Sequence, residues 1–186
     1  RFPVTGGPLR EQYGDVALLV WTTTPWTLVS NTAAAVNPEL DYVLARATDG
    51  EQVVVAAARR EALLGPDSEV VAEFRGAELV GTPYQRPFEW VAFPETDAPV
   101  HTVLAADFVT AEDGTGLVHE APAFGAEDFA LCRANGLPIV NPVRTNGTFE
   151  PGIPVVGGVF FKAADEGLVT ELAERGLLFQ RQDYTH

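Results

Sequence analysis

Glycine and proline recur along the whole chain, and this limits how long any helix or strand can be. Seventeen glycines and fourteen prolines are spread over 186 residues, with no internal repeat and no low-complexity segment. Glycine favours turns, and proline cannot continue a helix or pair within a central strand. The sequence therefore predicts many short elements joined by turns, within a single domain over residues 1–186.

Short apolar runs between the turns predict β-strands. Residues 16–21 form an apolar run rich in valine and leucine, which is typical of a fully buried strand, and residues 33–36 form a second one. Residues 42–47 and 52–55 flank Asp49-Gly50, a dipeptide that predicts a hairpin with a type I′ turn. Four further strand candidates are residues 69–74, 100–104, 117–119 and 177–180.

Three segments predict helices: residues 56–64, 126–135 and 163–175. The second has Glu127 and Asp128 in its first turn, where negative charge suits the helix dipole. The predicted strands outnumber the helices and do not alternate regularly with them. We therefore expect a mainly β fold with peripheral α-helix, namely a closed, mostly antiparallel β-barrel with attached short helices.

The charge balance argues against a protein that holds a long nucleic acid by itself. Twelve basic residues face 26 acidic ones, which gives a formal net charge of −14, and Lys162 is the sole lysine. Contacts to phosphates supply most of the affinity of nucleic-acid-binding proteins and require basic side chains. The longest clean apolar run, residues 16–21, is far shorter than a membrane span, so no membrane partner is expected.

Several kinds of catalytic site lack the residues they need. His101, His119 and His186 are widely spaced, so we expect no metal site. The two serines do not lie in a GxSxG motif, which argues against a serine hydrolase. Cys132 is the single cysteine, which excludes an internal disulfide and favours a reducing, cytoplasmic compartment. Because the sequence contains no methionine, we expect it to be an excised piece of a longer protein.

A threonine-rich loop directly after the first buried strand is the first candidate for chemistry. Residues 22–27 read TTTPWT, and Asn31 follows shortly after. This loop gathers hydroxyls, an amide and an indole at a strand end, where rigid scaffolds place binding groups. The residues also allow a structural interpretation, because threonine suits strands and Pro25 with Trp26 could cap a barrel.

The second candidate is the segment from His119 to Asp128, which reads HEAPAFGAED. A predicted strand ends at His119, Pro122 and Gly125 bend the chain, and a helix begins near Asp128. One short segment could thus present an imidazole ring and a carboxylate to a common cavity, where the carboxylate could pair with a ligand ammonium. The structural alternative is a buried histidine and an acid at a helix start.

These two segments resemble the signature segments of the editing (CP1) domain inserted in isoleucyl-tRNA synthetases, which are class I enzymes. The matching stretches are TTTPWTL at residues 22–28 with Asn31, and GTGLVHEAPAFGAEDF at residues 114–129. Thr24, Trp26 and His119 distinguish this type from the relatives that edit for valine or leucine. We expect the resemblance to extend over the whole chain. One departure is Val29-Ser30, where many relatives have proline, so the loop before Asn31 can differ in shape.

The resemblance implies a proofreading function. Valine is one methylene smaller than isoleucine, a difference worth only about 1–3 kcal/mol, and this synthetase family is itself the standard illustration of that limit. A second site would hydrolyse mischarged Val-tRNA(Ile) after transfer, and valyl-adenylate before transfer, while excluding isoleucine by size. The parent enzyme would join isoleucine to tRNA with ATP and magnesium, whereas this domain would need no cofactor.

The resemblance also assigns roles to individual residues. Asp128 would bind the α-ammonium of the misattached amino acid, and His119 would form the wall that rejects isoleucine. Trp26 would shape the same cavity. The three threonines Thr22, Thr23 and Thr24 would hold the aminoacyl ester and terminal ribose and help to place the attacking water.

Two further residues and the partners complete the prediction. Thr27 and Asn31 would lie close to the terminal adenosine or would support the loop. The partners would be the 3′ end of mischarged tRNA(Ile), valyl-adenylate and the remainder of the parent synthetase, with the isolated domain a monomer. The residues also allow a non-catalytic β-barrel module that binds an RNA 3′ end or a partner protein. A small-molecule esterase would need a nucleophile or metal that the sequence lacks.

Overall fold

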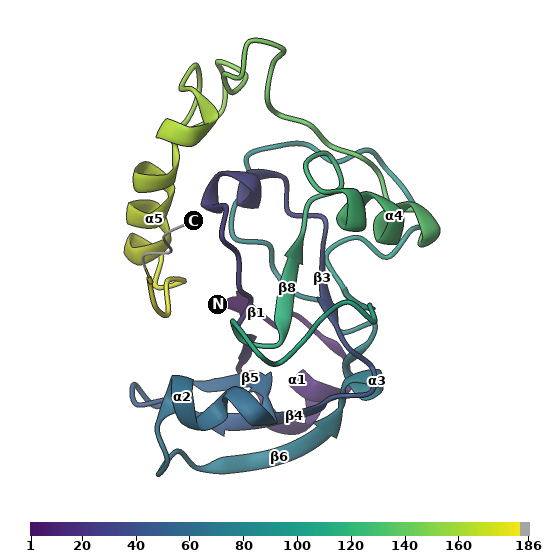
Figure 1. The fold of residues 1–186 in the computed structure, drawn as a ribbon, viewed down its shortest axis with the longest axis vertical. Helices are drawn as coiled ribbons and strands as arrows, with labels where there is room; N and C mark the ends of the chain where they lie inside the picture. The colour runs from purple at the N-terminus through teal and green to yellow at the C-terminus, as the bar shows by residue number, and fades with distance from the viewer. Residues whose placement is uncertain (183–186) are drawn as a thin grey trace.

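A computed structural model describes residues 1–182 and shows two small mixed sheets (Figure 1). The first has the strand order β1-β2-β5-β4-β6 and the second the order β7-β3-β8. The strands of the first sheet are β1 (Phe2–Pro3), β2 (Val16–Leu18), β5 (Gln52–Ala56), β4 (Asp41–Arg46) and β6 (Val70–Arg75). Those of the second are β7 (Val103–Ala105), β3 (Ala33–Val36) and β8 (Leu117–Glu120).

The expected closed, mostly antiparallel barrel is wrong. Each sheet contains a parallel pair: β2 pairs with β5, with Ala17 opposite Val53, and β3 pairs with β7, with Ala34 opposite Val103. Helical segments also cover at least as much of the described chain as strands do. Apolar runs indicated where the strands lie. However, long stretches of chain separate β2 and β3 from their parallel partners β5 and β7, and no local pattern in the sequence predicts such pairing.

The hairpin between β4 and β5 forms as predicted, but its turn differs. The Ala47 nitrogen donates to the Glu51 carbonyl at 2.8 Å, and the Gly50 nitrogen donates to the Ala47 carbonyl at 2.9 Å. The loop therefore has three residues, and Gly50 takes a positive φ of 88°. A type I′ turn needs positive φ at Asp49 as well, which the structure does not show, so that prediction is wrong.

Five α-helices and three 3₁₀ helices surround the sheets. The α-helices are α1 (Gly7–Tyr13), α2 (Arg60–Leu64), α3 (Gly76–Leu79), α4 (Ala126–Ala134) and α5 (Asp165–Glu174), within the described residues. The 3₁₀ helices are η1 (Pro25–Ser30), η2 (Ala57–Arg59) and η3 (Phe161–Ala163). The two long predicted helices, α4 and α5, are confirmed. Helices α1 and α3 were not predicted, and residues 177–180 form no strand.

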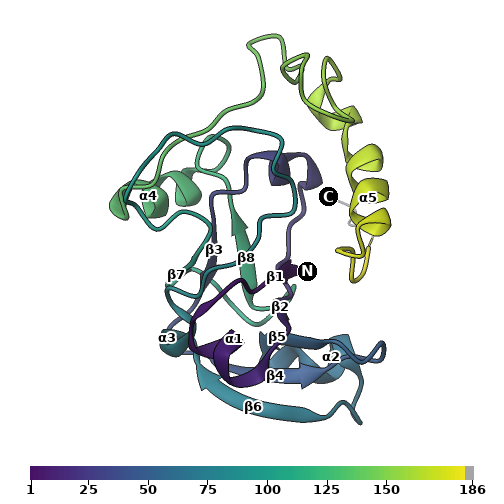
Figure 2. The same cartoon turned by 180° about the vertical axis from the view of Figure 1, so that it is seen from behind.

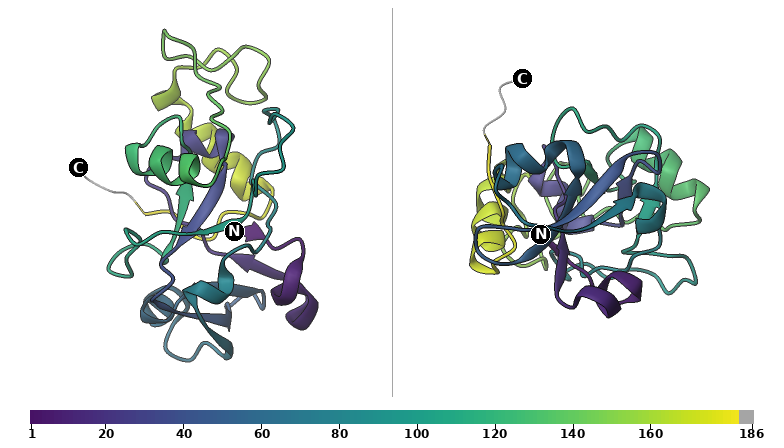
Figure 3. Two further views of the ribbon diagram at one scale, coloured as in Figure 1. Left: turned by 90° about the vertical axis from the view of Figure 1, so that its right-hand side faces the viewer. Right: turned by 90° about the horizontal axis from the view of Figure 1, so that it is seen from below.

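The helices α4 and α5 lie on opposite flanks of the molecule, with β8 and η1 between them (Figures 1 and 2). The chain that joins α4 to α5 passes over one end of the molecule (Figure 3). The main core joins both sheets to α5, through buried side chains such as Leu18, Leu44, Val36, Val103 and Leu168. Within residues 1–182, no helix is long and apolar enough to cross a membrane.

The chain crosses from one sheet to the other directly after β2. The predicted strand over residues 16–21 is regular only as far as Leu18. The Trp21 nitrogen then donates to the Leu117 carbonyl at 2.9 Å, and the His119 nitrogen donates back to the Trp21 carbonyl at 3.3 Å. Because Trp21 is attached to β8 in this way, the threonine-rich loop that follows it begins beside His119.

Candidate functional site

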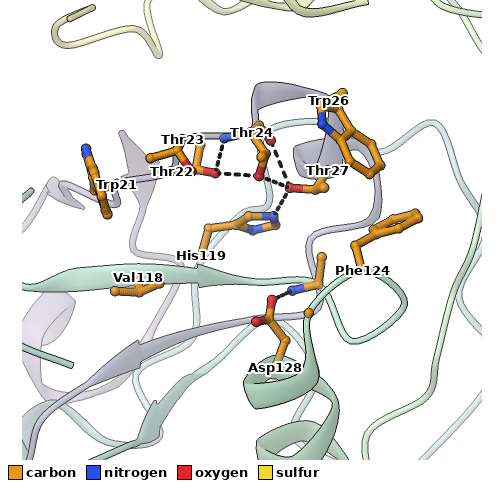
Figure 4. Close-up of a pocket in the computed structure, with 12 residues that line it drawn as sticks. Trp21, Thr22, Thr23, Thr24, Trp26, Thr27, Val118, His119, Phe124 and Asp128 are labelled. Carbon is orange, nitrogen blue, oxygen red and sulfur yellow. Dashed lines mark hydrogen bonds between the residues drawn. The ribbon is translucent and has the colours of Figure 1, made fainter. Parts of the chain in front are cut away.

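A pocket of about 200 Å³ lies where the chain leaves Trp21 and where β8 ends (Figure 4). Both sequence segments contribute to it, as predicted. Its lining residues are Trp21, Thr22, Thr23, Thr24, Trp26, Thr27, Val118, His119, Ala121, Phe124, Gly125 and Asp128. Of the residues predicted for the site, Asn31 is the one that does not line this pocket.

The threonine hydroxyls form a connected set on one side of the pocket. Thr22 Oγ1 accepts the backbone N–H of Thr24 at 3.1 Å and lies 3.3 Å from Thr24 Oγ1. Thr24 Oγ1 lies 3.2 Å from Thr27 Oγ1. Pro25 begins the 3₁₀ helix η1, which folds Thr27 back onto the carbonyl of Thr24. Thr23 is exposed at the rim of the pocket.

His119 lies directly beneath these threonines, with both ring nitrogens engaged (Figure 4). Nε2 lies 3.0 Å from Thr27 Oγ1, and Nδ1 lies 2.8 Å from Asn31 Nδ2. Burial lowers the pKa of His119 to about 3, so the ring is neutral near pH 7. Asn31 is fully buried beneath the ring. Its geometry therefore fits the predicted supporting role and not a contact with a bound adenosine.

Asp128 lies in the first turn of α4 at the edge of the pocket (Figure 4). Its Oδ2 accepts the backbone N–H of Ala121 at 2.8 Å. The side chain is half-buried, and burial raises the pKa of Asp128 above its ordinary value, against the opposing effect of that hydrogen bond. The carboxylate is therefore held in place by the bend between β8 and α4.

Aromatic rings close the pocket on the side of α5. The ring of Trp26 contacts the rings of Phe124 and Phe161, with centroids 4.7 Å and 4.5 Å apart. The Trp26 nitrogen donates to Asp165 Oδ1 at 2.8 Å, so the first residue of α5 caps the start of η1. Sequence reasoning missed Phe161 and Asp165, because nothing local relates them to Trp26. Phe124 lies inside the second segment but carries no polar group that would single it out.

Glu120, also missed, is the buried acid next to His119. Neighbouring strand residues point to opposite faces, so Glu120 faces away from the pocket. It has no exposed surface, and neither carboxyl oxygen has a hydrogen-bond partner among the described residues. Burial, with the nearby charges of Asp128 and Glu127, raises the pKa of Glu120 to about 9. Alternation along β8 places Glu120 on the face opposite His119, and no local pattern in the sequence shows that this face is buried as well.

The other cysteine and histidine side chains within residues 1–182 offer no second site. Cys132 is buried, and burial raises the pKa of its thiol to about 12, so it is not a reactive thiolate. His101 is half-buried, with Nε2 3.1 Å from the Asn31 carbonyl oxygen. Across residues 1–182, no group of three or more His, Cys, Asp or Glu side chains could hold a metal ion. His186 lies outside the described residues.

The chain is similar in sequence to isoleucine–tRNA ligases. That of Thermobifida fusca is 60% identical over 188 residues, which cover the whole chain and 17% of that protein. That of Streptomyces avermitilis is 58% identical over the same span, again with 17% of the protein covered. The chain therefore spans about a sixth of the length of these curated relatives. No protein-family model matches the chain.

Solved structures show a similar fold at low sequence identity. The crystal structure of GlLeuRS-CP1 matches with a TM-score of 0.72 and 15% identity, covering 98% of both chains. The cytosolic leucyl-tRNA synthetase editing domain of P. knowlesi matches with a TM-score of 0.51 and 16% identity, covering 68% of this chain and 54% of that one. At these identities the likeness concerns the fold alone.

Proposed function

Because this chain belongs to the editing (CP1) domains of the isoleucyl-tRNA synthetases, we propose that it removes valine wrongly joined to tRNA(Ile). The reaction is hydrolysis of the ester in Val-tRNA(Ile), and of valyl-adenylate, with isoleucine excluded by size. The observation that supports it most is that the threonine-rich loop and Asp128 share one pocket. The two segments lie about a hundred residues apart in the sequence, and a non-catalytic module would need no such convergence.

Asp128 binds the α-ammonium group of the misattached valine. Its carboxylate faces the pocket and is oriented by the backbone of Ala121, so little reorganisation accompanies binding. A charge-assisted hydrogen bond in a half-buried place is stronger than the same pair in water. Asp128 thereby fixes the amino acid in one orientation, with its carbonyl carbon toward the threonine loop.

His119 and Trp26 bound the space for the amino-acid side chain. The pocket volume of about 200 Å³ lies below the roughly 300–1,000 Å³ that is typical of small-molecule sites. A small aliphatic side chain suits such a space. The His119 ring is fixed by hydrogen bonds at both nitrogens, so it cannot move aside for isoleucine without losing them.

Positioned water, and not a protein base, carries out the attack. His119 is neutral, but Nδ1 faces the Asn31 amide and Nε2 faces Thr27, so neither nitrogen is available to take a proton from water. The hydroxyls of Thr22, Thr23 and Thr24 orient the water and the aminoacyl ester, and a ribose hydroxyl of the terminal adenosine assists.

The acidic charge of the chain fits a tRNA partner of which only the 3′ end enters this domain. At a net charge of −14, this domain binds the tRNA body weakly, and the remainder of the parent synthetase holds the phosphates. That parent acts in the cytoplasm and supplies the ATP-dependent ligation. A submicromolar dissociation constant of the isolated chain for tRNA at physiological salt would contradict this division of labour.

The test is hydrolysis by the purified chain, used at high concentration to offset weak binding. Val-tRNA(Ile) and Ile-tRNA(Ile) are incubated separately with it, and the remaining ester is measured over time. We expect loss of the valyl ester above the uncatalysed rate, with the isoleucyl ester spared. Equal rates with and without the protein, or equal loss of both esters, would argue for a binding module.

A further inference from the structure

A chain of hydrogen bonds runs from buried residues beneath the pocket to the threonines that line it. It passes through five side chains in order: Tyr84, Asn31, His119, Thr27 and Thr24. The last three line the pocket, whereas Asn31 is 0% exposed and Tyr84 is 3% exposed. Tyr84 lies far from both signature segments in the sequence. The donors and acceptors along this chain can be assigned one after another.

The carbonyl of Ala33 fixes the orientation of the Asn31 amide. This carbonyl oxygen can only accept, and it lies 3.0 Å from the Asn31 amide nitrogen. Asn31 Oδ1 accordingly faces the Tyr84 hydroxyl, which donates to it at 2.8 Å. The same amide nitrogen lies 2.8 Å from His119 Nδ1 and can only donate. Nδ1 must therefore accept, and the neutral ring carries its proton on Nε2.

The His119 tautomer in turn fixes the direction of two hydroxyls. Nε2–H donates to Thr27 Oγ1 at 3.0 Å, and Thr27 Oγ1 donates its single hydrogen to the Thr24 carbonyl at 2.9 Å. Because Thr27 has no further hydrogen, Thr24 Oγ1 is the donor in the 3.2 Å contact between the two hydroxyls, and Thr22 Oγ1 is then the donor in its 3.3 Å contact with Thr24 Oγ1. The Thr24 hydroxyl thus points its hydrogen into the protein.

We propose that Asn31 is a positioning residue that, through His119 and Thr27, makes the Thr24 hydroxyl an acceptor for the attacking water. This inference rests on the proposed hydrolysis. The water oxygen bonds to the valyl carbonyl carbon, the bond from that carbon to the ribose oxygen breaks, and the water proton ends on the ribose oxygen. A water that donates a hydrogen bond to Thr24 directs a lone pair toward the carbonyl carbon, whereas a Thr24 hydroxyl turned outward would occupy that lone pair.

The tautomer can be measured without any activity assay. In the ¹⁵N-histidine-labelled chain, the resonances of His119 are assigned by their loss in His119→Gln. We expect Nε2 protonated, Nδ1 unprotonated and no titration between pH 5 and pH 8. A proton on Nδ1, or fast exchange between the two tautomers, would overturn the proposal. This measurement stands even if the variants at Thr27 or Asn31 fail to fold.

Two variants test the consequence for the reaction. Thr27→Val keeps the side-chain shape but removes the acceptor of both His119 and Thr24, and we expect kcat for Val-tRNA(Ile) to fall about 10- to 100-fold with KM little changed. Asn31→Asp replaces the donor facing Nδ1 by an acceptor, so the proton should move to Nδ1 and kcat should fall similarly. A moved proton with unchanged kcat would overturn the role of Asn31.

A matched control comes from the same buried segment. The Thr32 hydroxyl is also buried, but it donates to the Ser30 carbonyl at 3.1 Å and lies outside the chain that ends at Thr24. Thr32→Val should therefore keep kcat, and an equal loss in this variant would show that Thr27→Val acts through general loosening. An inactive wild-type chain would instead refute the proposed function, while the tautomer measurement would still be decided separately.

Discussion

The carboxylate of Asp128 accepts the backbone N–H of Ala121 across 2.8 Å, and this contact ties the end of β8 to the first turn of α4. One side chain thus closes a bend in the chain and presents a negative charge to the pocket. The structural contribution needs only an acceptor oxygen, whereas ammonium binding needs the charge. A substitution that keeps the acceptor oxygen and removes the negative charge can therefore separate the two roles of Asp128.

Asp128→Asn is that substitution. Its amide oxygen can still accept from Ala121, so we expect the free energy of unfolding to change by less than about 1 kcal/mol. Loss of a charged partner for the valine ammonium should lower kcat/KM for Val-tRNA(Ile) about 10- to 100-fold. Asp128→Ala should lose a further 1–3 kcal/mol of stability, at roughly the cost of an unpaired buried N–H. Urea unfolding and deacylation rates measure the two effects, and a fully active Asp128→Asn would remove Asp128 from ammonium binding.

Gly125→Ala tests the position of the Asp128 carboxylate by placing a methyl group against it. A Cβ at Gly125 would lie 2.3 Å from Asp128 Oδ1, so the carboxylate would have to move. Gly125 has a φ of −132°, so alanine adds no backbone strain there. We expect deacylation to fall about 10- to 100-fold, and stability to fall by at most the roughly 1–3 kcal/mol expected for Asp128→Ala, because the displaced carboxylate can lose its bond to Ala121. Gly152→Ala, where a Cβ would meet nothing within 4 Å, is the control that should behave like the wild type.

Local chemistry was sufficient to predict which residues share the pocket, but not the sheets around it. Residues 33–36 and the helix that starts near Asp128 lie where the apolar runs and the helix-start acids put them. The pocket residues lie within two contiguous segments of the sequence. Residues of one segment lie close together in any fold, so the sequence already grouped most of the pocket residues. Strand partners depend on long connections, and for that reason the parallel pairing of β2 with β5 was missed.

The remaining misses involve residues that act at a distance in the sequence. Asp165 caps η1 and Tyr84 donates to Asn31, yet each lies more than 50 positions from its partner. An aspartate at a helix start and an isolated tyrosine have ordinary local explanations. Only the folded chain shows that the positions of Trp26 and His119 depend on them.

Glu120→Gln should change how stability depends on pH. The folded-state pKa of Glu120, about 9, lies above the ordinary value of 4.5, so the folded protein keeps a proton that the unfolded chain releases. This contribution is fully present below pH 4.5 and is lost as the pH rises through 9, at up to about 1.4 kcal/mol per pH unit. We expect the stability advantage of Glu120→Gln over the wild type to grow between pH 5 and pH 9.

Urea unfolding of the two proteins across this pH range measures the difference, in which titrating groups that do not interact with Glu120 cancel. Glu174→Gln removes an exposed carboxylate on α5 that does not contribute to the raised pKa of Glu120, and it should leave the pH dependence close to that of the wild type. A constant difference between Glu120→Gln and the wild type would show that Glu120 is ionised in the folded protein at neutral pH.

His119→Ala should admit isoleucine to the pocket. Removing the ring enlarges the space beside Trp26, and a single methylene is worth about 1–3 kcal/mol of discrimination, so hydrolysis of Ile-tRNA(Ile) should rise about 10- to 100-fold relative to Val-tRNA(Ile). The ratio of the two rates is the informative quantity, because both rates will also fall as Thr27 and Asn31 lose a partner. If the variant still spares Ile-tRNA(Ile), another residue sets the size limit.

The wild-type preference for valine should also be independent of pH between 6 and 8. With the pKa of His119 at about 3, the ring stays neutral over this range, and both its hydrogen bonds and its position are unchanged. Rates for both esters can vary with pH, because uncatalysed hydrolysis does, but their ratio should not. If the ratio instead follows a titration near pH 6.5, the His119 ring is more accessible to water than its burial beneath the threonine loop implies. A ring that moves in this way could not act as a fixed wall.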